Sequence, residues 1–135
     1  MRKIIVGLLV AFAGLALLAA PAAAQVAKPS KALVSCPGSK SQTDDGITVR
    51  VYYVPYGNNC QVNHVQAWSA QGSKYGHFNL FGPYGWSDNS PTKSWGWGEP
   101  YDSYPWAIAW PGHLWCAKFY DGNNQPVTGN VCVTI

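Results

Sequence analysis

Four cysteines constrain the fold of this 135-residue chain more than any other feature of its sequence. They are Cys36, Cys60, Cys116 and Cys132. All four follow an N-terminal segment that is typical of exported proteins, and an even number of cysteines in an exported chain indicates two disulfides. Each bridge restricts the unfolded chain and contributes about 2–4 kcal/mol. For a small domain, that is comparable with much of the net stability.

The pairing of the cysteines is open to three connectivities. Pairing neighbours, Cys36 with Cys60 and Cys116 with Cys132, is the simplest arrangement, because the last two lie on expected consecutive strands. A symmetric hairpin, however, would place Cys132 opposite Phe119 rather than Cys116. A bulge in the connecting loop would correct this offset, and a crossed pattern remains an alternative.

The N-terminus reads as a signal peptide. Arg2 and Lys3 precede an uncharged apolar run that extends to about residue 20. Small residues at Ala22 and Ala24 suit the narrow pockets of a signal peptidase, which predicts cleavage after Ala24. We therefore expect a secreted protein that is extracellular or associated with the cell envelope.

Two other interpretations of this region are weaker. The apolar run is about 17 residues long, near the lower limit for a membrane-spanning helix, and the cleavage site that follows it argues against a stable membrane anchor. The segment Leu33–Cys36 resembles a bacterial lipobox, in which the cysteine is lipidated. In lipoproteins that motif adjoins the apolar run, whereas here Lys28, Pro29 and Lys31 intervene.

The sequence thus divides into three expected segments: a cleaved signal peptide (1–24), a flexible lead-in (25–31) and a single disulfide-bonded β domain (32–135). Loss of Arg2 and Lys3 with the signal peptide lowers the net charge from +3 by two, to +1. The remaining basic residues are scattered. Nucleic acid binding needs a concentrated basic patch, so we expect no nucleic acid partner.

The domain is expected to be all-β, because no window after the signal peptide shows a helical apolar stripe. The strongest strand is Ile47–Val54, in which apolar and polar side chains alternate; the inward face of Val62–Trp68 is ambiguous. About seven short strands favour a small antiparallel β-sandwich or barrel. The expected strands are Ala32–Cys36, Ile47–Val54, Val62–Trp68, His77–Phe81, Trp106–Trp110, Leu114–Tyr120 and Val131–Ile135.

Two segments are expected to be loops. Pro37–Gly46 has turn composition. Gly82–Tyr104 is dense in Gly, Pro, Ser, Trp and Tyr, and is predicted to be a long ordered loop with an edge strand around Lys93–Trp97.

Aromatic content is the one compositional anomaly. All seven tryptophans and eight tyrosines follow the signal peptide. Those in expected strands are assigned to the core: Phe78, Phe81, Trp106, Trp115 and Phe119. Those in the long loop are harder to bury, and an exposed Trp or Tyr suits a sugar ring or a protein hot spot. The predicted ligand-binding residues are Tyr84, Trp86, Asp88, Asn89, Trp95, Trp97, Glu99 and Tyr101.

No residue pattern indicates catalysis, a metal or a cofactor. The sequence contains no G-x-S-x-G or H-E-x-x-H motif. The pairs Asp88/Glu99 and Glu99/Asp102 would be the candidates for a glycosidase, but acids in Gly/Pro loops are usually turn formers. The Asp121–Asn124 segment is typical of a β-turn rather than a calcium loop.

The sequence therefore favours a secreted, non-catalytic binding protein that recognises a glycan or cell-wall polymer through exposed aromatic residues. One alternative is a secreted protein-interaction module, such as a protease inhibitor or small toxin, that presents Pro37–Gly46 or Asp121–Gly129 to an extracellular protein. Another alternative is a structural protein of the envelope or spore coat that self-associates through the aromatic surface.

Overall fold

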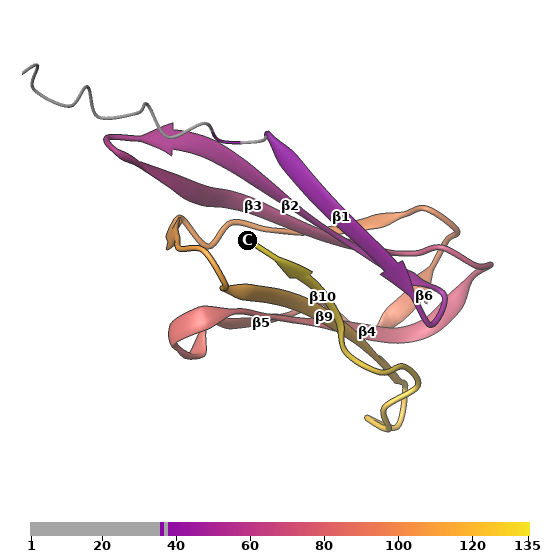
Figure 1. The fold of residues 1–135 in the computed structure, drawn as a ribbon. Helices are drawn as coiled ribbons and strands as arrows, with labels where there is room; N and C mark the ends of the chain where they lie inside the picture. The colour runs from indigo at the N-terminus through magenta and orange to yellow at the C-terminus, as the bar shows by residue number, and fades with distance from the viewer. Residues whose placement is uncertain (1–35, 37) are drawn as a thin grey trace, which may run out of the picture. The chain divides into compact units, whose positions relative to one another are not determined.

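In a computed structural model, residue 36 and residues 38–135 form a β-sandwich of two antiparallel sheets (Figure 1). Sheet A has the strand order β1-β2-β3-β7, and β8 also pairs with β3. Sheet B has the order β10-β9-β4-β5, and β6 also pairs with β4. The elements are β1 (Ser39–Asp44), β2 (Ile47–Tyr56), β3 (Asn59–Ser69), β4 (Lys74–Phe81), the 3-10 turn η1 (Pro83–Gly85), β5 (Ser87–Asn89), β6 (Lys93–Trp95), β7 (Pro100–Ser103), β8 (Ala107–Ala109), β9 (Leu114–Asp121) and β10 (Val131–Thr134).

The expected all-β fold is confirmed for these residues. The predicted signal peptide, the lead-in and residues 32–35 of the first expected strand lie outside the described residues.

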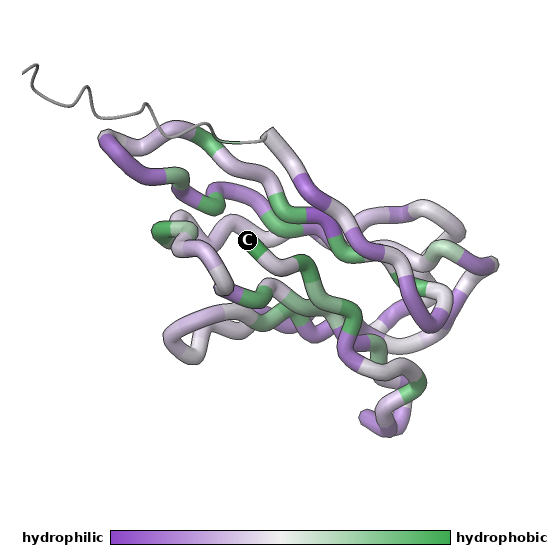
Figure 2. Tube along the Cα trace, in the orientation of Figure 1, coloured by the Kyte–Doolittle hydropathy of each residue, from purple (hydrophilic) through white to green (hydrophobic). Residues whose placement is uncertain are grey.

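The alternation predicted for β2 is the alternation observed. Ile47, Val49, Val51 and Tyr53 face the interior and are buried, because a strand directs successive side chains to opposite faces. Burial of the Tyr53 hydroxyl raises its pKa to about 12. In Figure 2 the hydrophobic segments lie along the strands of both layers, and the outer hairpins are hydrophilic.

Sheet B contributes the largest buried side chains. Phe78 of β4 packs edge-to-face on Phe119 of β9, with ring centroids 4.9 Å apart. Trp115 of β9 is completely buried, and Trp86 lies against it at 5.2 Å. The core assignments of Phe78, Trp115 and Phe119 are therefore confirmed.

Both disulfides connect neighbouring cysteines. Cys36 bonds to Cys60 at the start of β3, and Cys116 of β9 bonds to Cys132 of β10. The two cysteines of the second bridge are directly opposite in the strand register, 4.0 Å apart between Cα atoms. The connecting segment is irregular and offsets the symmetric hairpin, which would have placed Cys132 opposite Phe119.

The prediction that Pro37–Gly46 is a loop is wrong, because most of this segment is strand β1. All six side chains of β1 are exposed, so its sequence carries no apolar alternation to reveal it. The signal that was available is the dipeptide Asp45-Gly46. Both residues have positive φ (47° and 70°), as a two-residue hairpin turn requires.

The long loop predicted for Gly82–Tyr104 is also wrong in part. The edge strand expected around Lys93–Trp97 is confirmed as β6, but the segment also contains β5 and β7, which were not expected; the described residues form ten strands in all. These strands have only three or four residues each and pair at the sheet edges, too short to show a period of two. Trp106 was assigned to the core, but it precedes β8 and is 59% exposed.

We predict that Gly76→Ala destabilises the fold far more than Gly57→Ala. A Cβ at Gly76 would lie 1.9 Å from the Tyr120 carbonyl oxygen, whereas a Cβ at Gly57 meets no atom within 4 Å. Both glycines have positive φ, so Gly57→Ala should cost about 1 kcal/mol. Gly76→Ala should cost about 3 kcal/mol, because the backbone of β9 must move. Urea unfolding measures both values, and equal losses would contradict this packing.

Candidate functional site

The eight residues predicted to bind a ligand do not form one surface. Tyr84 lies in η1, beyond the end of β4, whereas Trp97 follows β6, which pairs with the start of β4. Because β4 has eight residues and a strand rises about 3.3 Å per residue, β4 is about 23 Å long, and these two residues lie beyond its opposite ends.

Trp95, one of the predicted contacts, belongs to the core. It is 3% exposed, its Nε1 donates to the Gly76 carbonyl at 3.1 Å, and its ring packs on Phe78. The prediction that Trp95 is an exposed contact is therefore wrong. Trp86 is half-buried against Trp115, so only part of its ring is accessible.

Asp88, Asn89 and Tyr101 connect the edges of the two sheets. Asp88 of β5 accepts a hydrogen bond from Ser103 of β7, and the Tyr101 hydroxyl donates to the Asn89 carbonyl at 3.1 Å. Burial, together with the neighbouring Asp88 carboxylate, raises the pKa of Tyr101 to about 12. These residues close one side of the sandwich.

Glu99 and Trp97 belong to the small turn between β6 and β7, at the end of the sandwich opposite Tyr84. Glu99 accepts hydrogen bonds from Lys93 Nζ and from the Gly96 backbone N–H, both at 2.7 Å. The Lys93 ammonium, followed by the Gly96 amide, lowers the pKa of Glu99. Trp97 is 74% exposed, and its Nε1 donates to the Ala70 carbonyl at 3.2 Å.

We predict that Lys93→Met raises the pKa of Glu99 toward its ordinary value, because the largest interaction with the charged form is lost. Because the pKa of Glu99 is lower in the folded state, its carboxylate stabilises the fold. This stabilisation is complete above the unfolded-state pKa and is lost as the pH falls through the folded-state pKa. NMR titration of the Glu99 carboxyl measures this shift. Ser94→Ala, on the same strand, should leave it unchanged.

The structure instead gathers polar and aromatic side chains on the outer face of sheet A. Outward residues of β2, β3 and β7 form rows across the strands. Three rows follow from the register and the ring contacts: Thr48–Trp68–Pro100, Arg50–Gln66–Asp102 and Tyr52–His64–Tyr104. A contact joins the first row to the second: the Arg50 guanidinium lies over the Trp68 ring, 5.1 Å from its centroid.

The third row is a stack of three rings. The His64 ring lies between Tyr52 and Tyr104, with centroid distances of 4.7 and 4.8 Å and interplanar angles of 12° and 9°. His64 is half-buried in this stack, and Tyr104 is 60% exposed. One face of the Tyr104 ring is therefore covered by His64, and the ring is otherwise accessible.

Hydrogen bonds fix these rings to the neighbouring row. The Tyr52 hydroxyl donates to Gln66 Oε1 at 2.7 Å, and Gln66 Nε2 donates to Asp102 Oδ1 at 2.6 Å. His64 Nε2 lies 2.7 Å from the same Oδ1, and since a carboxylate only accepts, this nitrogen carries the proton. Asp102 Oδ2 forms no hydrogen bond with the described residues and is available to a donor.

Two backbone irregularities build this arrangement. The β2–β3 register shifts between Tyr52 and Tyr53, which leaves Asn63 as the extra residue of a bulge in β3. On the other side of β3, the strand pairing is interrupted between β7 and β8. There Trp106 has φ 49°, and its carbonyl accepts a hydrogen bond from Gln61 Nε2 at 3.0 Å.

Bulges and positive φ at a large side chain recur at functional sites, where they redirect side chains. We define the bulge site as Tyr52, His64, Gln66, Asp102, Tyr104 and Trp106. Only the ambiguous periodicity of Val62–Trp68 pointed to it in the sequence. Its members are spread over 55 positions from Tyr52 to Trp106, and their strand register was not predictable.

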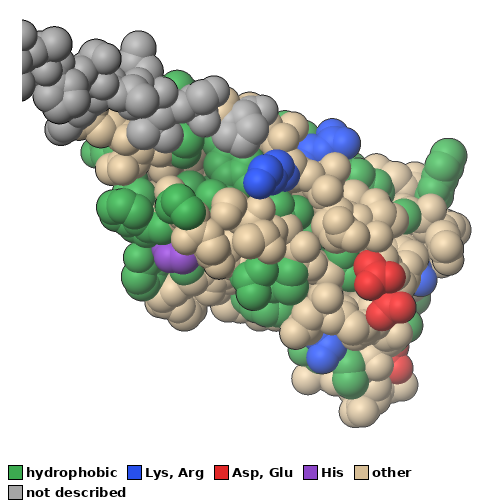
Figure 3. Space-filling model, in the orientation of Figure 1, with side chains coloured by type: hydrophobic (Ala, Val, Ile, Leu, Met, Phe, Trp, Pro, Cys, Tyr) green, Lys and Arg blue, Asp and Glu red, His purple; other side chains and the backbone are tan. Residues whose placement is uncertain are grey.

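Further exposed aromatic residues continue from the bulge site to the adjoining end of the sandwich. Tyr56 ends β2, Trp110 follows β8, and Tyr84 packs edge-on against His113. Figure 3 shows hydrophobic side chains gathered around a histidine at this end. Tyr84 is 81% exposed with φ 60°, so a second large ring is presented from a strained backbone. Of the eight predicted residues, Tyr84 lies at this end, and Trp86, half-buried against Trp115, directly follows η1.

Comparisons with known proteins give no relative: no family model matches the chain, and no curated protein or solved structure matches it. Within the described residues, no helix is long and apolar enough to cross a bilayer. The same residues contain no group of three or more His, Cys, Asp or Glu side chains placed to hold a metal ion. The two disulfides indicate an oxidising environment.

Proposed function

We propose that this chain is a secreted, non-catalytic binding protein that recognises a glycan through the bulge site. The observation that carries the proposal is the Tyr52–His64–Tyr104 stack beside the Asp102 carboxylate. Sugar rings present apolar C–H faces that pack on aromatic rings, and hydroxyls that need hydrogen-bond acceptors and donors. The bulge site offers both on one face of sheet A.

Rigidity supports this assignment. Immobilising a free side chain on binding costs about 0.5–1.5 kcal/mol. In the bulge site, stacking and hydrogen bonds already hold Tyr52, His64 and Gln66. A ligand that packs on Tyr104 and donates to Asp102 Oδ2 would therefore bind a preformed surface.

Secretion belongs to the same proposal. The charged, apolar and small-residue sequence before Gln25 predicts export, and both disulfides fit the oxidising compartment beyond the membrane. A glycan on a cell surface, a cell wall or an extracellular polymer is the ligand that such a protein meets.

A second candidate is binding to an extracellular protein at the adjoining end. The exposed rings of Tyr56, Tyr84 and Trp110 favour it, because Tyr and Trp dominate interface hot spots. The inhibitor-like loop Pro37–Gly46 no longer supports this alternative, since most of it is strand.

We predict that Tyr104→Ala weakens retention on the bound polysaccharide about 30-fold in Kd, the loss of about 2 kcal/mol typical of an aromatic hot spot. Trp106→Ala should act in the same direction. Pull-down of the purified oxidised protein on a panel of insoluble polysaccharides and cell walls measures retention, and near-UV circular dichroism verifies the fold.

The matched control is Trp97→Ala, which removes a more exposed ring at the opposite end of the sandwich. It should leave retention unchanged. If Trp97→Ala lost retention and Tyr104→Ala kept it, the bulge site would not be the binding surface. Loss with Tyr84→Ala but not with Tyr104→Ala would favour the adjoining end instead.

A further inference from the structure

Strand β1 leaves one edge of sheet A open. Among the described residues, β1 pairs with β2 alone. The Tyr53 N–H donates to the Gly38 carbonyl, so Gly38 and Tyr53 form a hydrogen-bonded pair. Hydrogen-bonded and non-hydrogen-bonded pairs alternate along an antiparallel ladder. The backbone groups of Ser39, Ser41 and Thr43 therefore point to the open edge.

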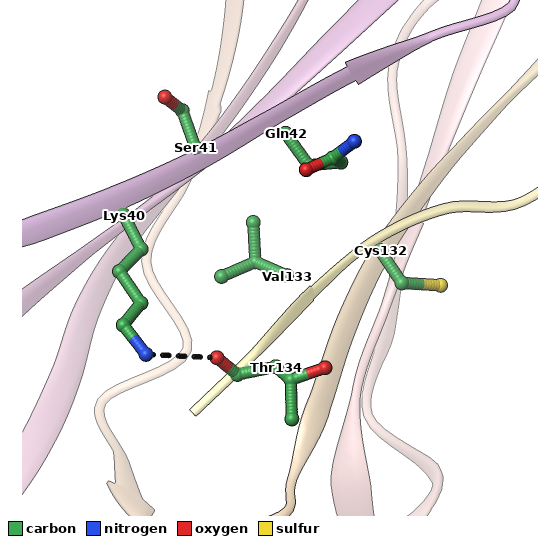
Figure 4. A pocket seen from close by; sticks show the side chains of 6 residues that line it. All are labelled: Lys40, Ser41, Gln42, Cys132, Val133 and Thr134. Atoms are coloured by element: carbon green, nitrogen blue, oxygen red, sulfur yellow. Dashed lines mark hydrogen bonds between the residues drawn. The ribbon is translucent and has the colours of Figure 1, made fainter.

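The side chains of alternate β1 residues lie on the inner face of the sheet. Lys40, Gln42 and Asp44 are opposite the inward residues of β2. Lys40 Nζ donates to the Thr134 carbonyl at 3.2 Å, across a shallow groove of about 250 Å³ between β1 and β10 (Figure 4). β10 of sheet B lies beside β1 but does not bury it, since all six residues of β1 are exposed.

The charges on this edge are self-complementary. In an antiparallel pairing of β1 with β1 of a second copy, centred on Gln42, Lys40 lies opposite Asp44 twice. In the same register Ser41 lies opposite Thr43, so the residues with free backbone groups form the hydrogen-bonded pairs. A pairing centred on Ser41 would also align the backbone, but it places Lys40 opposite Gln42 and leaves both charges unpaired.

We propose that β1 is a self-association edge through which two copies of this chain pair antiparallel, joined by two Lys40–Asp44 ion pairs. Side chains in non-hydrogen-bonded pairs are the closest across a ladder, which suits these ion pairs. A local hydrogen bond, from Gln42 Nε2 to the Thr43 carbonyl at 3.4 Å, is exchanged for an intermolecular one. The interface is small, so the dimer is weak and reversible.

Dimerisation makes sheet A continuous across both copies and places two bulge sites on one outer face. For a repeating polymer, two linked sites bind more tightly than one, because the second contact becomes intramolecular. This consequence rests on the proposed function, whereas the dimer itself does not.

Charge exchange tests the proposal. Sedimentation velocity of the purified oxidised protein should show a reversible monomer–dimer equilibrium. Lys40→Glu places two acids opposite each other, and Asp44→Lys places two lysines, so each variant alone should be monomeric. A mixture of the two should form heterodimers, because every charge then faces its opposite. The double variant should dimerise like the wild type.

Ser41→Pro provides a second test without a change of charge. It removes an N–H that points to the open edge and spares the ladder with β2, so the fold is kept and the dimer is lost. The control Ser41→Ala should dimerise normally.

A wild-type protein that stays monomeric up to about 1 mM would overturn the proposal. Single charge variants that dimerise as well as the wild type would also overturn it. In the first case the inward charges of β1 serve to prevent edge pairing, and in the second the dimer forms through another surface. Retention of the monomeric variants on polysaccharide tests the bulge site separately.

Discussion

One extra residue in β3 determines what the outer face of sheet A presents. Asn63 interrupts the pairing with β2, so Val62 and Val65 both face the core although three positions separate them. Without the bulge, the period of two would direct either Val62 or Val65 outward. The bulge keeps both valines buried and places His64 between Tyr52 and Tyr104.

The remaining structure holds that strand in position. β3 is paired with β2 along one edge and with β7 and β8 along the other, so its outward residues are fixed from both sides. Its start is tied by the Cys36–Cys60 bridge, and its inner face packs on the aromatic core of sheet B. A rigid scaffold of this kind allows exposed rings to keep one arrangement without a ligand.

The sequence predicted those elements whose environment is uniform along their length. β2 alternates without interruption, so its two faces could be assigned from residue identity alone. β1 has no apolar alternation, because a strand exposed on every residue needs no apolar positions, so only the Asp45-Gly46 turn after it could have indicated it. Trp95 was predicted to be exposed and is buried, whereas Trp106 was predicted to be buried and is exposed. Burial of a ring in or beside a short edge strand depends on which neighbour that strand pairs with. The bulge site required the register of β2, β3 and β7, which is a tertiary property.

The most direct test of the account is to locate the ligand on the protein. Amide and indole ¹H–¹⁵N spectra, recorded while soluble fragments of a retained polysaccharide are added, report which residues change environment. The account predicts shifts concentrated at Tyr52, His64, Asp102 and Tyr104 and at the Trp106 indole. Shifts concentrated at Trp97 and Tyr75, at the far end of the sandwich, would contradict it.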